Sequence, residues 1–185
     1  MFDFLFTNPN FNSAIKVVLH HEGLLSNDAN DPGGITKYGI SLRFLRAAGI
    51  DGNGYRSGHV GPEDVRALDV NQATAIYRKY FWNKNNFNQI QSTLISTSLF
   101  DMSVLMGAYD AIELIQNALS DQTVNKVTVD GIMGAKTINA INQVNSSRLN
   151  ERFKMLCIEH FEFLIKKNKL LAPFLDGWKN RVNSL

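Results

Sequence analysis

Apolar residues near the start of the chain repeat with the period of an α-helix. Five of them form one stripe: Phe11, Ala14, Ile15, Val18 and Leu19. A stripe of this kind is stable when it packs against other elements, so it favours a fold built from packed helices. Asn8 and Pro9 lie just before it and are typical of a helix start. Glu22 is the next member of the stripe, directly before Gly23. The first helix therefore ends on an inward-facing carboxylate.

Helical patterns continue along the rest of the chain. We predict a short helix between Ser41 and Gly49, and another that begins at the capping pair Asp69 and Gln72. Four more helical stretches follow. The first covers about residues 92–120 with a break at Gly107, and the second follows the segment VDGIMGAKT and ends at about residue 145. The last two cover about residues 148–169 and 174–182. The polar loop after Gly23 leads into a small β-hairpin near residues 30–40. The expected fold class is mainly α.

Composition excludes several classes of protein. A formal net charge of +2 lacks the dense basic footprint of a nucleic-acid binder. The sequence contains no run of about 18 apolar residues, so no transmembrane segment is predicted. The single cysteine, Cys157, cannot form an internal disulfide and is expected to be buried. The first eleven residues lack the features of a signal peptide, so we expect synthesis in the cytoplasm.

Glu22 has the position of a general acid. Burial on the inward stripe and the negative end of the helix dipole both favour the protonated carboxyl. A protonated carboxyl can donate to the leaving oxygen when a glycosidic bond breaks. The alternative is an exposed glutamate that merely ends a helix. The neighbouring His20 and His21 lack the spacing of a zinc site, so no metal or other cofactor is expected.

The loop after Glu22 offers the second carboxylate that glycoside cleavage needs. Asp28 and Asp31 lie in a polar, Gly-rich setting that would keep them ionised, and either could activate water. Thr36 and Tyr38 add hydroxyl groups that could position a water molecule or a sugar. Asp-Pro-Gly-Gly is also an ordinary turn sequence, so the pattern alone leaves a purely structural loop open.

Three segments resemble a known family of enzymes. The stretch HEGLLSNDANDPGGITKYGIS, residues 21–41, resembles the signature of glycoside hydrolase family 108, a group of N-acetylmuramidases that includes phage endolysins and secretion-activating proteins. VDGIMGAKTINAI, residues 129–141, is similar to the turn-to-helix element of peptidoglycan-binding modules. FLDGWKNRV, residues 174–182, looks like the ending of family members. One departure is Leu24, which stands where the family signature has a second glycine.

The resemblance implies a lysozyme-like helical fold with a catalytic region at residues 1–120 and a peptidoglycan-binding-like region at 121–185. It implies that Glu22 is the catalytic acid. Asp31 and Thr36 match the Glu, Asp, Thr arrangement of helical phage lysozymes, although Thr36 comes five residues after Asp31 where six is usual, and Asp28 stays an alternative. Five residues are expected to contact the substrate: Gly34, Lys37, Tyr38, Tyr80 and Trp82.

We therefore expect a monomeric peptidoglycan hydrolase that cleaves the β-1,4 bond between N-acetylmuramic acid and N-acetylglucosamine. The alternatives are a lytic transglycosylase, which needs no activated water, and a non-catalytic peptidoglycan-binding protein. Release by a holin would bring an endolysin to the wall, and attack from outside is the other route. Lys166, Lys167 and Lys169 belong to a basic C-terminal segment that either faces solvent or contacts the anionic cell-envelope surface.

Overall fold

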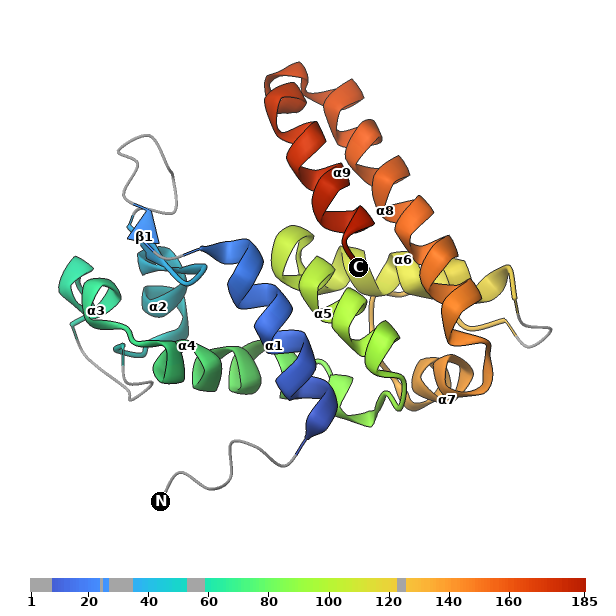
Figure 1. Ribbon diagram of the computed structural model, residues 1–185, viewed down its shortest axis with the longest axis horizontal. Helices are drawn as coiled ribbons and strands as arrows, with labels where there is room; N and C mark the ends of the chain where they lie inside the picture. Colours follow the sequence, from blue (N-terminus) through green and yellow to red (C-terminus); the bar gives the residue numbers. More distant parts are fainter. Residues whose placement is uncertain (1–7, 24, 27–34, 53–58, 123–125) are drawn as a thin grey trace.

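A computed structural model describes residues 8–23, 25–26, 35–52, 59–122 and 126–185 of the chain. Helix α1 (Pro9–Glu22) packs along α5 (Thr93–Met106) in the middle of the molecule. Figure 1 shows one lobe, formed by the described residues between 35 and 89, and a second group of helices, formed by those between 108 and 183. Helices α8 (Ser146–Lys167) and α9 (Leu175–Asn183) project from that second group as a paired arm. The fold is mainly α, as the sequence predicts.

Helix α1 begins and buries its stripe as its sequence dictates. The side chain of the N-cap residue Asn8 accepts a hydrogen bond from the backbone N–H of Phe11, and Pro9 occupies the first turn. Phe11, Ala14, Ile15 and Val18 are buried against α5 and its neighbours. The helix ends before Gly23, which has a positive φ. Glu22 is thereby fixed at the helix end next to α5.

The β structure is a three-stranded antiparallel sheet of very short strands. Strands β1 (Leu25–Ser26), β2 (Thr36–Lys37) and β3 (Ile40–Ser41) pair in that order. Tyr38 and Gly39 connect β2 to β3 with φ values of 51° and 74°. Positive φ at both central residues is what a two-residue type I′ hairpin requires. The predicted hairpin is therefore present, at residues 36–41.

The lobe is completed by five short elements. Helix α2 (Leu42–Ala48) is capped by Ser41 and ends at Gly49 in the left-handed region, as predicted. Helix α3 (Pro62–Ala67) was not predicted from the sequence. Helix α4 (Val70–Tyr77) begins with the predicted capping box and continues as the π-helix η2 (Arg78–Asn83). A 3₁₀ turn, η3 (Phe87–Gln89), leads back to α5.

The second half of the chain is helical. Helix α6 (Ala108–Ser120) packs on α5 and on α8 (Ser146–Lys167), with α7 (Ala135–Gln143) beneath them. A 3₁₀ segment, η4 (Lys169–Phe174), turns the chain back into α9 (Leu175–Asn183), which packs along α8. Cys157 is buried on α8, as expected, and burial raises the pKa of its thiol.

One apolar core runs through both halves of the molecule, from Phe11 in α1 to Val182 in α9. The predicted boundary at residues 120 and 121 falls at the end of α6 and stays a prediction. Within the described parts of the chain, none of the helices has the length and apolar character needed to span a bilayer.

Candidate active site

Glu22 makes an ion pair with a residue from the other end of the chain. Its Oε1 atom lies 2.8 Å from Nη1 of Arg181, which is on α9. The side chain of Glu22 is 19% exposed and that of Arg181 is 11% exposed. Burial and the helix end are visible in the sequence, but the guanidinium that lies directly against this carboxylate is visible only in the structure.

A fully buried carboxylate holds the other side of the guanidinium. Arg181 donates from Nε to Oδ2 of Asp101 at 2.8 Å and from Nη2 to Oδ1 at 3.0 Å. Burial opposes the charged guanidinium, but the hydrogen bonds and charges of Asp101 and Glu22 outweigh it and raise the pKa of Arg181. Breaking a buried pair by removing one partner costs about 3–5 kcal/mol. The pair of Asp101 and Arg181 therefore ties α9 firmly to α5.

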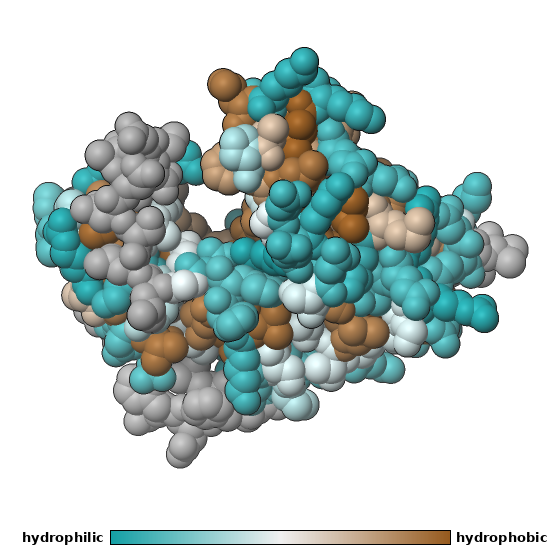
Figure 2. All heavy atoms as spheres, turned by 45° about the horizontal axis from the view of Figure 1, so that its top comes forward, coloured by the Kyte–Doolittle hydropathy of each residue, from teal (hydrophilic) through white to brown (hydrophobic). Residues whose placement is uncertain are grey.

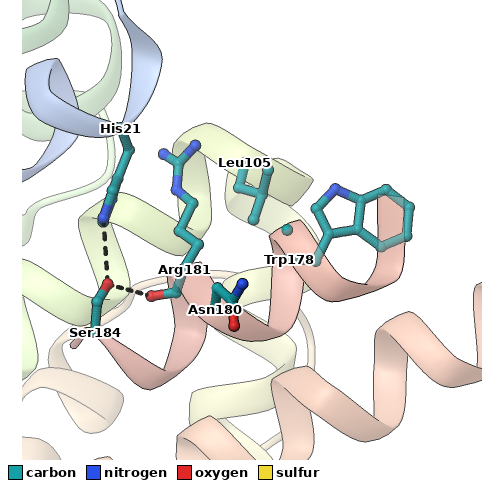
Figure 3. Close-up of a pocket in the computed structure, with 7 residues that line it drawn as sticks. His21, Leu105, Trp178, Asn180, Arg181 and Ser184 are labelled. Carbon is teal, nitrogen blue, oxygen red and sulfur yellow. Dashed lines mark hydrogen bonds between the residues drawn. The ribbon is translucent and has the colours of Figure 1, made fainter. Parts of the chain in front are cut away.

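His21 joins the same network from α1. Its Nδ1 atom donates to Oδ1 of Asp101 at 3.0 Å. On the other side of its ring, Nε2 lies 3.2 Å from the hydroxyl of Ser184, which itself donates to the backbone oxygen of Arg181 at 2.7 Å. Figure 3 shows the two contacts of Ser184, with His21 and with the backbone oxygen of Arg181, at the edge of a pocket of about 410 Å³ that His21, Arg181 and Trp178 help to line. Three helices thus meet beside Glu22.

The hairpin turn packs on the other face of Glu22. A Cβ atom built on Gly39 would lie 2.7 Å from both Cγ and Oε2 of Glu22 and would overlap the hydroxyl of Tyr77. Only glycine therefore fits at this approach. Tyr77 donates a hydrogen bond to the backbone oxygen of Tyr38 at 3.0 Å and so fixes the turn from α4. Burial, followed by the charge of Glu22, raises the pKa of the Tyr77 hydroxyl, which keeps it protonated as a donor.

Three of the predicted site residues, Asp28, Asp31 and Gly34, lie outside the described residues. Thr36 and Lys37 form β2, immediately before the turn that contacts Glu22. The ammonium of Lys37 donates to the backbone oxygen of Arg66 at 2.7 Å, so it links the sheet to α3. The structure therefore brings β2 and the Tyr38–Gly39 turn to the end of α1, next to the predicted acid.

The two predicted aromatic residues have different surroundings. Tyr80 is half-buried on η2, where it contacts Phe44 edge to face. Trp82 is 1% exposed and packs against Phe11 and Phe100 with ring centroids 5.3 Å and 5.2 Å away. A sugar ring cannot stack on an indole that the core already covers, so the predicted role of Trp82 as a substrate contact does not fit its burial.

Arg181, Asp101 and Tyr77 were missed as members of the site. Asp101 carried a usable signal, because it is the only charged residue in the apolar stretch from Thr93 to Met106. A carboxylate on an apolar helix needs a cationic partner when it is buried. Within the described ranges, no three His, Cys, Asp or Glu side chains form a group that could hold a metal ion.

Comparison with known proteins identifies the family. A family model described as "Glycosyl hydrolase 108" matches residues 15–107, about half of the chain. The chain belongs to the glycosyl hydrolase 108 family. A second model, described as "Predicted Peptidoglycan domain", matches residues 110–183. The curated proteins gave no match to this sequence.

A solved structure supports the same assignment. This family 108 chain is similar to the structure of SagA from Brucella abortus, with a TM-score of 0.73 and 28% sequence identity. The match covers 94% of this chain and 90% of SagA. The protein is therefore a glycoside hydrolase, and its second matched region assigns peptidoglycan as the polymer it acts on. The boundary between the two matched regions falls at the start of α6. Glu22 therefore belongs to the first matched region and Arg181 to the second.

Proposed function

We propose that the protein hydrolyses the β-1,4 bond between N-acetylmuramic acid and N-acetylglucosamine, with Glu22 as the general acid. The placement of Glu22 carries this proposal. Its carboxyl is partly exposed at the end of α1, beside the pocket that His21 and Arg181 line. The molecular surface in Figure 2 is hollowed between the lobe and the arm, which gives a glycan strand a place to lie.

The reaction needs a second carboxylate that contacts water. Asp101 is not suited to this role, because its side chain is 0% exposed and is bound by Arg181 and His21. Asp31, with Asp28 as its alternative, remains the proposed residue that activates water, and Thr36 on β2 would assist it. Substitution of each aspartate by asparagine decides between them, because only the variant that lacks the activating carboxylate should lose hydrolysis.

The chemical ends of the products test the reaction type. A muramidase that activates water leaves reducing N-acetylmuramic acid ends when it digests purified peptidoglycan. A lytic transglycosylase, the alternative reaction, leaves 1,6-anhydromuramic ends, and mass spectrometry separates the two. The proposal requires reducing muramic ends, and either anhydro ends or reducing glucosamine ends would reject it. Family membership favours an enzyme over the non-catalytic binding protein.

We propose the biological role of an endolysin: a bacteriolytic enzyme, made in the cytoplasm during phage infection, that reaches the periplasm through holin-type lesions. A secretion-activating muramidase of a bacterium is the second candidate. Expression inside a bacterium tests the route. Cells should keep growing until their inner membrane is permeabilised and should then lyse, whereas lysis without permeabilisation would contradict the need for release.

The arm tip, residues 163–174, offers a surface for the anionic cell envelope. Lys166, Lys167 and Lys169 are exposed there. They flank Leu170 and Phe174, whose side chains are 83% and 56% exposed. Lysines beside exposed apolar groups suit an anionic polymer or a lipid surface. We propose that the arm tip steers the enzyme toward the envelope.

A further inference from the structure

The orientation of the Arg181 guanidinium is fixed by Asp101. Two of its three nitrogen atoms, Nε and Nη2, are bound by the two oxygens of this buried carboxylate. A guanidinium is planar and its N–H groups form a rigid fork, so two occupied positions determine the direction of the third. The third nitrogen, Nη1, is the atom that meets Glu22 at 2.8 Å.

Glu22 is confined between this fixed donor and the hairpin turn. Arg181 contacts Oε1, while Oε2 lies beside Gly39, where the absence of a side chain leaves room next to that oxygen. A glutamate side chain has several rotatable bonds, and a free one at a helix end samples many positions. A misplacement of about 1 Å costs a catalytic group about 100-fold in rate.

We infer that Arg181 is a positioning residue, which holds the carboxyl of Glu22 in the orientation needed for proton transfer, and that Asp101 orients Arg181 for this task. The inference rests on the proposed role of Glu22. It also gives the second matched region a further role. The last helix of that region completes the catalytic centre, in addition to any binding of peptidoglycan. Arg181 is not a catalytic residue in this account, since it contacts Glu22 rather than the bond that breaks.

The test compares two variants on the same helix with soluble, uncrosslinked glycan oligomers of peptidoglycan as substrate. Arg181→Ala should lower kcat about 100-fold with little change in KM. Added guanidinium ion should restore part of that rate, because it can occupy the space between the two carboxylates. Lys179→Ala is the matched control: it removes a positive charge and an ion pair with Glu162 from α9, at a place that does not contact Glu22. Its kcat should equal that of the parent and should not respond to guanidinium.

A second variant separates positioning from folding. Arg181→Ala leaves Asp101 buried with His21 as its remaining partner, and this change alone could unfold the protein. In the double variant Asp101→Asn with Arg181→Gln, two neutral amides replace the buried charges and can bond to each other. Its melting temperature should lie close to that of the parent while kcat stays low and KM stays near the parent value.

The outcomes are distinct. A parental kcat in Arg181→Ala or in the double variant overturns the inference, as does a raised KM at unchanged kcat, which would make Arg181 a group that binds substrate. If the inference about Arg181 fails but Glu22→Gln is inactive in the same assay, the proposed function still stands. An active Glu22→Gln would instead reject the proposed function, whatever the Arg181 variants do.

Discussion

Single residues set the geometry of this site, and Gly39 is the clearest case. The backbone of the hairpin turn approaches Glu22 so closely that a Cβ atom would lie 2.7 Å from its Cγ. The positive φ of 74° adds a second reason for glycine, because L-residues with side chains rarely adopt it. The loop that follows Glu22 in the sequence therefore returns to Glu22 in space.

Gly39→Ala should abolish most of the activity, with a loss of about 100-fold or more, because the new methyl group displaces the carboxyl of Glu22. Gly49→Ala is the matched control. Gly49 also has a positive φ, of 63°, but nothing lies within 4 Å of the position of its Cβ. Both variants should lose about 1–2 kcal/mol of stability from the left-handed backbone. Assays of kcat and thermal melting of both check this, and equal activity of the two variants would remove Gly39 from the site.

The sequence could identify Glu22 but not its partner. The helical stripe and the glycine stop are local patterns, so the position of Glu22 follows from neighbours within two turns. Arg181 lies far away in the chain, and its pairing with Glu22 depends on where the packing of α9 on α8 places its side chain. Trp82 shows the same limit, because an aromatic residue reads alike in a core and in a sugar site.

At the scale of elements, the turn between α6 and α7 is held by one buried amide. Gln116 on α6 accepts hydrogen bonds from the backbone N–H groups of Asp130 and Gly131. Its amide group donates to Oδ1 of Asp130 and to the backbone oxygen of Ile132. The hydrogen bonds from Gln116 and from the backbone of Ile132 lower the pKa of Asp130 below its ordinary value of 3.8. The peptidoglycan-binding-like motif is therefore anchored to α6.

The Asp130→Asn variant should show a pH-dependent loss of stability. The folded state depresses the pKa of Asp130, so the charged carboxylate stabilises the fold above pH 3.8. This stabilisation is lost as the pH falls through the pKa that Asp130 has in the folded state. Asparagine keeps an oxygen acceptor but lacks the charge. The melting temperature of the variant should be slightly lower than that of the parent at pH 7, and the two melting temperatures should be equal in acid. The difference is small because Asp130 is exposed, and a difference independent of pH would contradict this account.

Several helix boundaries were predictable from the residues that cap them. Ser41, Asp69 and Gly107 each stand at the predicted end of a helix. The π-helix η2 and helix α3 were not predicted. A π-helix forms i→i+5 hydrogen bonds where an α-helix forms i→i+4 bonds, and the six residues of η2 are too few for this longer period to show in the apolar pattern. Helix α3 is only six residues long, too short for the helical period to show.

At the scale of the whole molecule, the arm separates a charged tip from the site at its base. Helix α9 carries Arg181 near its end, while the arm tip lies at its start. Changes at the tip should therefore leave the chemistry at Glu22 untouched. The two ends of α9 can be tested independently.

Replacement of Lys166, Lys167 and Lys169 by glutamine should reduce lysis of cells, most clearly at low salt, where charge attraction is least screened. Hydrolysis of soluble oligomers should stay normal. The control variant replaces Lys16, Lys84 and Lys126, which are exposed and lie outside both the arm and the motif at residues 129–141, and changes the net charge equally. Equal activity of both variants on cells at low ionic strength would end the steering proposal.

The whole fold converges on one carboxyl group. Helix α1 presents Glu22, the hairpin turn closes one side of it, and α9 holds the other side through Arg181 and the buried Asp101. Elements from both matched regions are needed for this arrangement. The central claim is that they serve to place a proton donor against a glycosidic bond.

The most direct test is the rate of bond cleavage by Glu22→Gln, measured as new reducing ends from soluble glycan oligomers. Glutamine is nearly isosteric and can still accept the hydrogen bond from Arg181, so melting should stay close to that of the parent. It has no carboxyl proton to give, and the account predicts a loss in kcat of about 10³-fold or more. A folded Glu22→Gln variant that cleaves at the parental rate would contradict it.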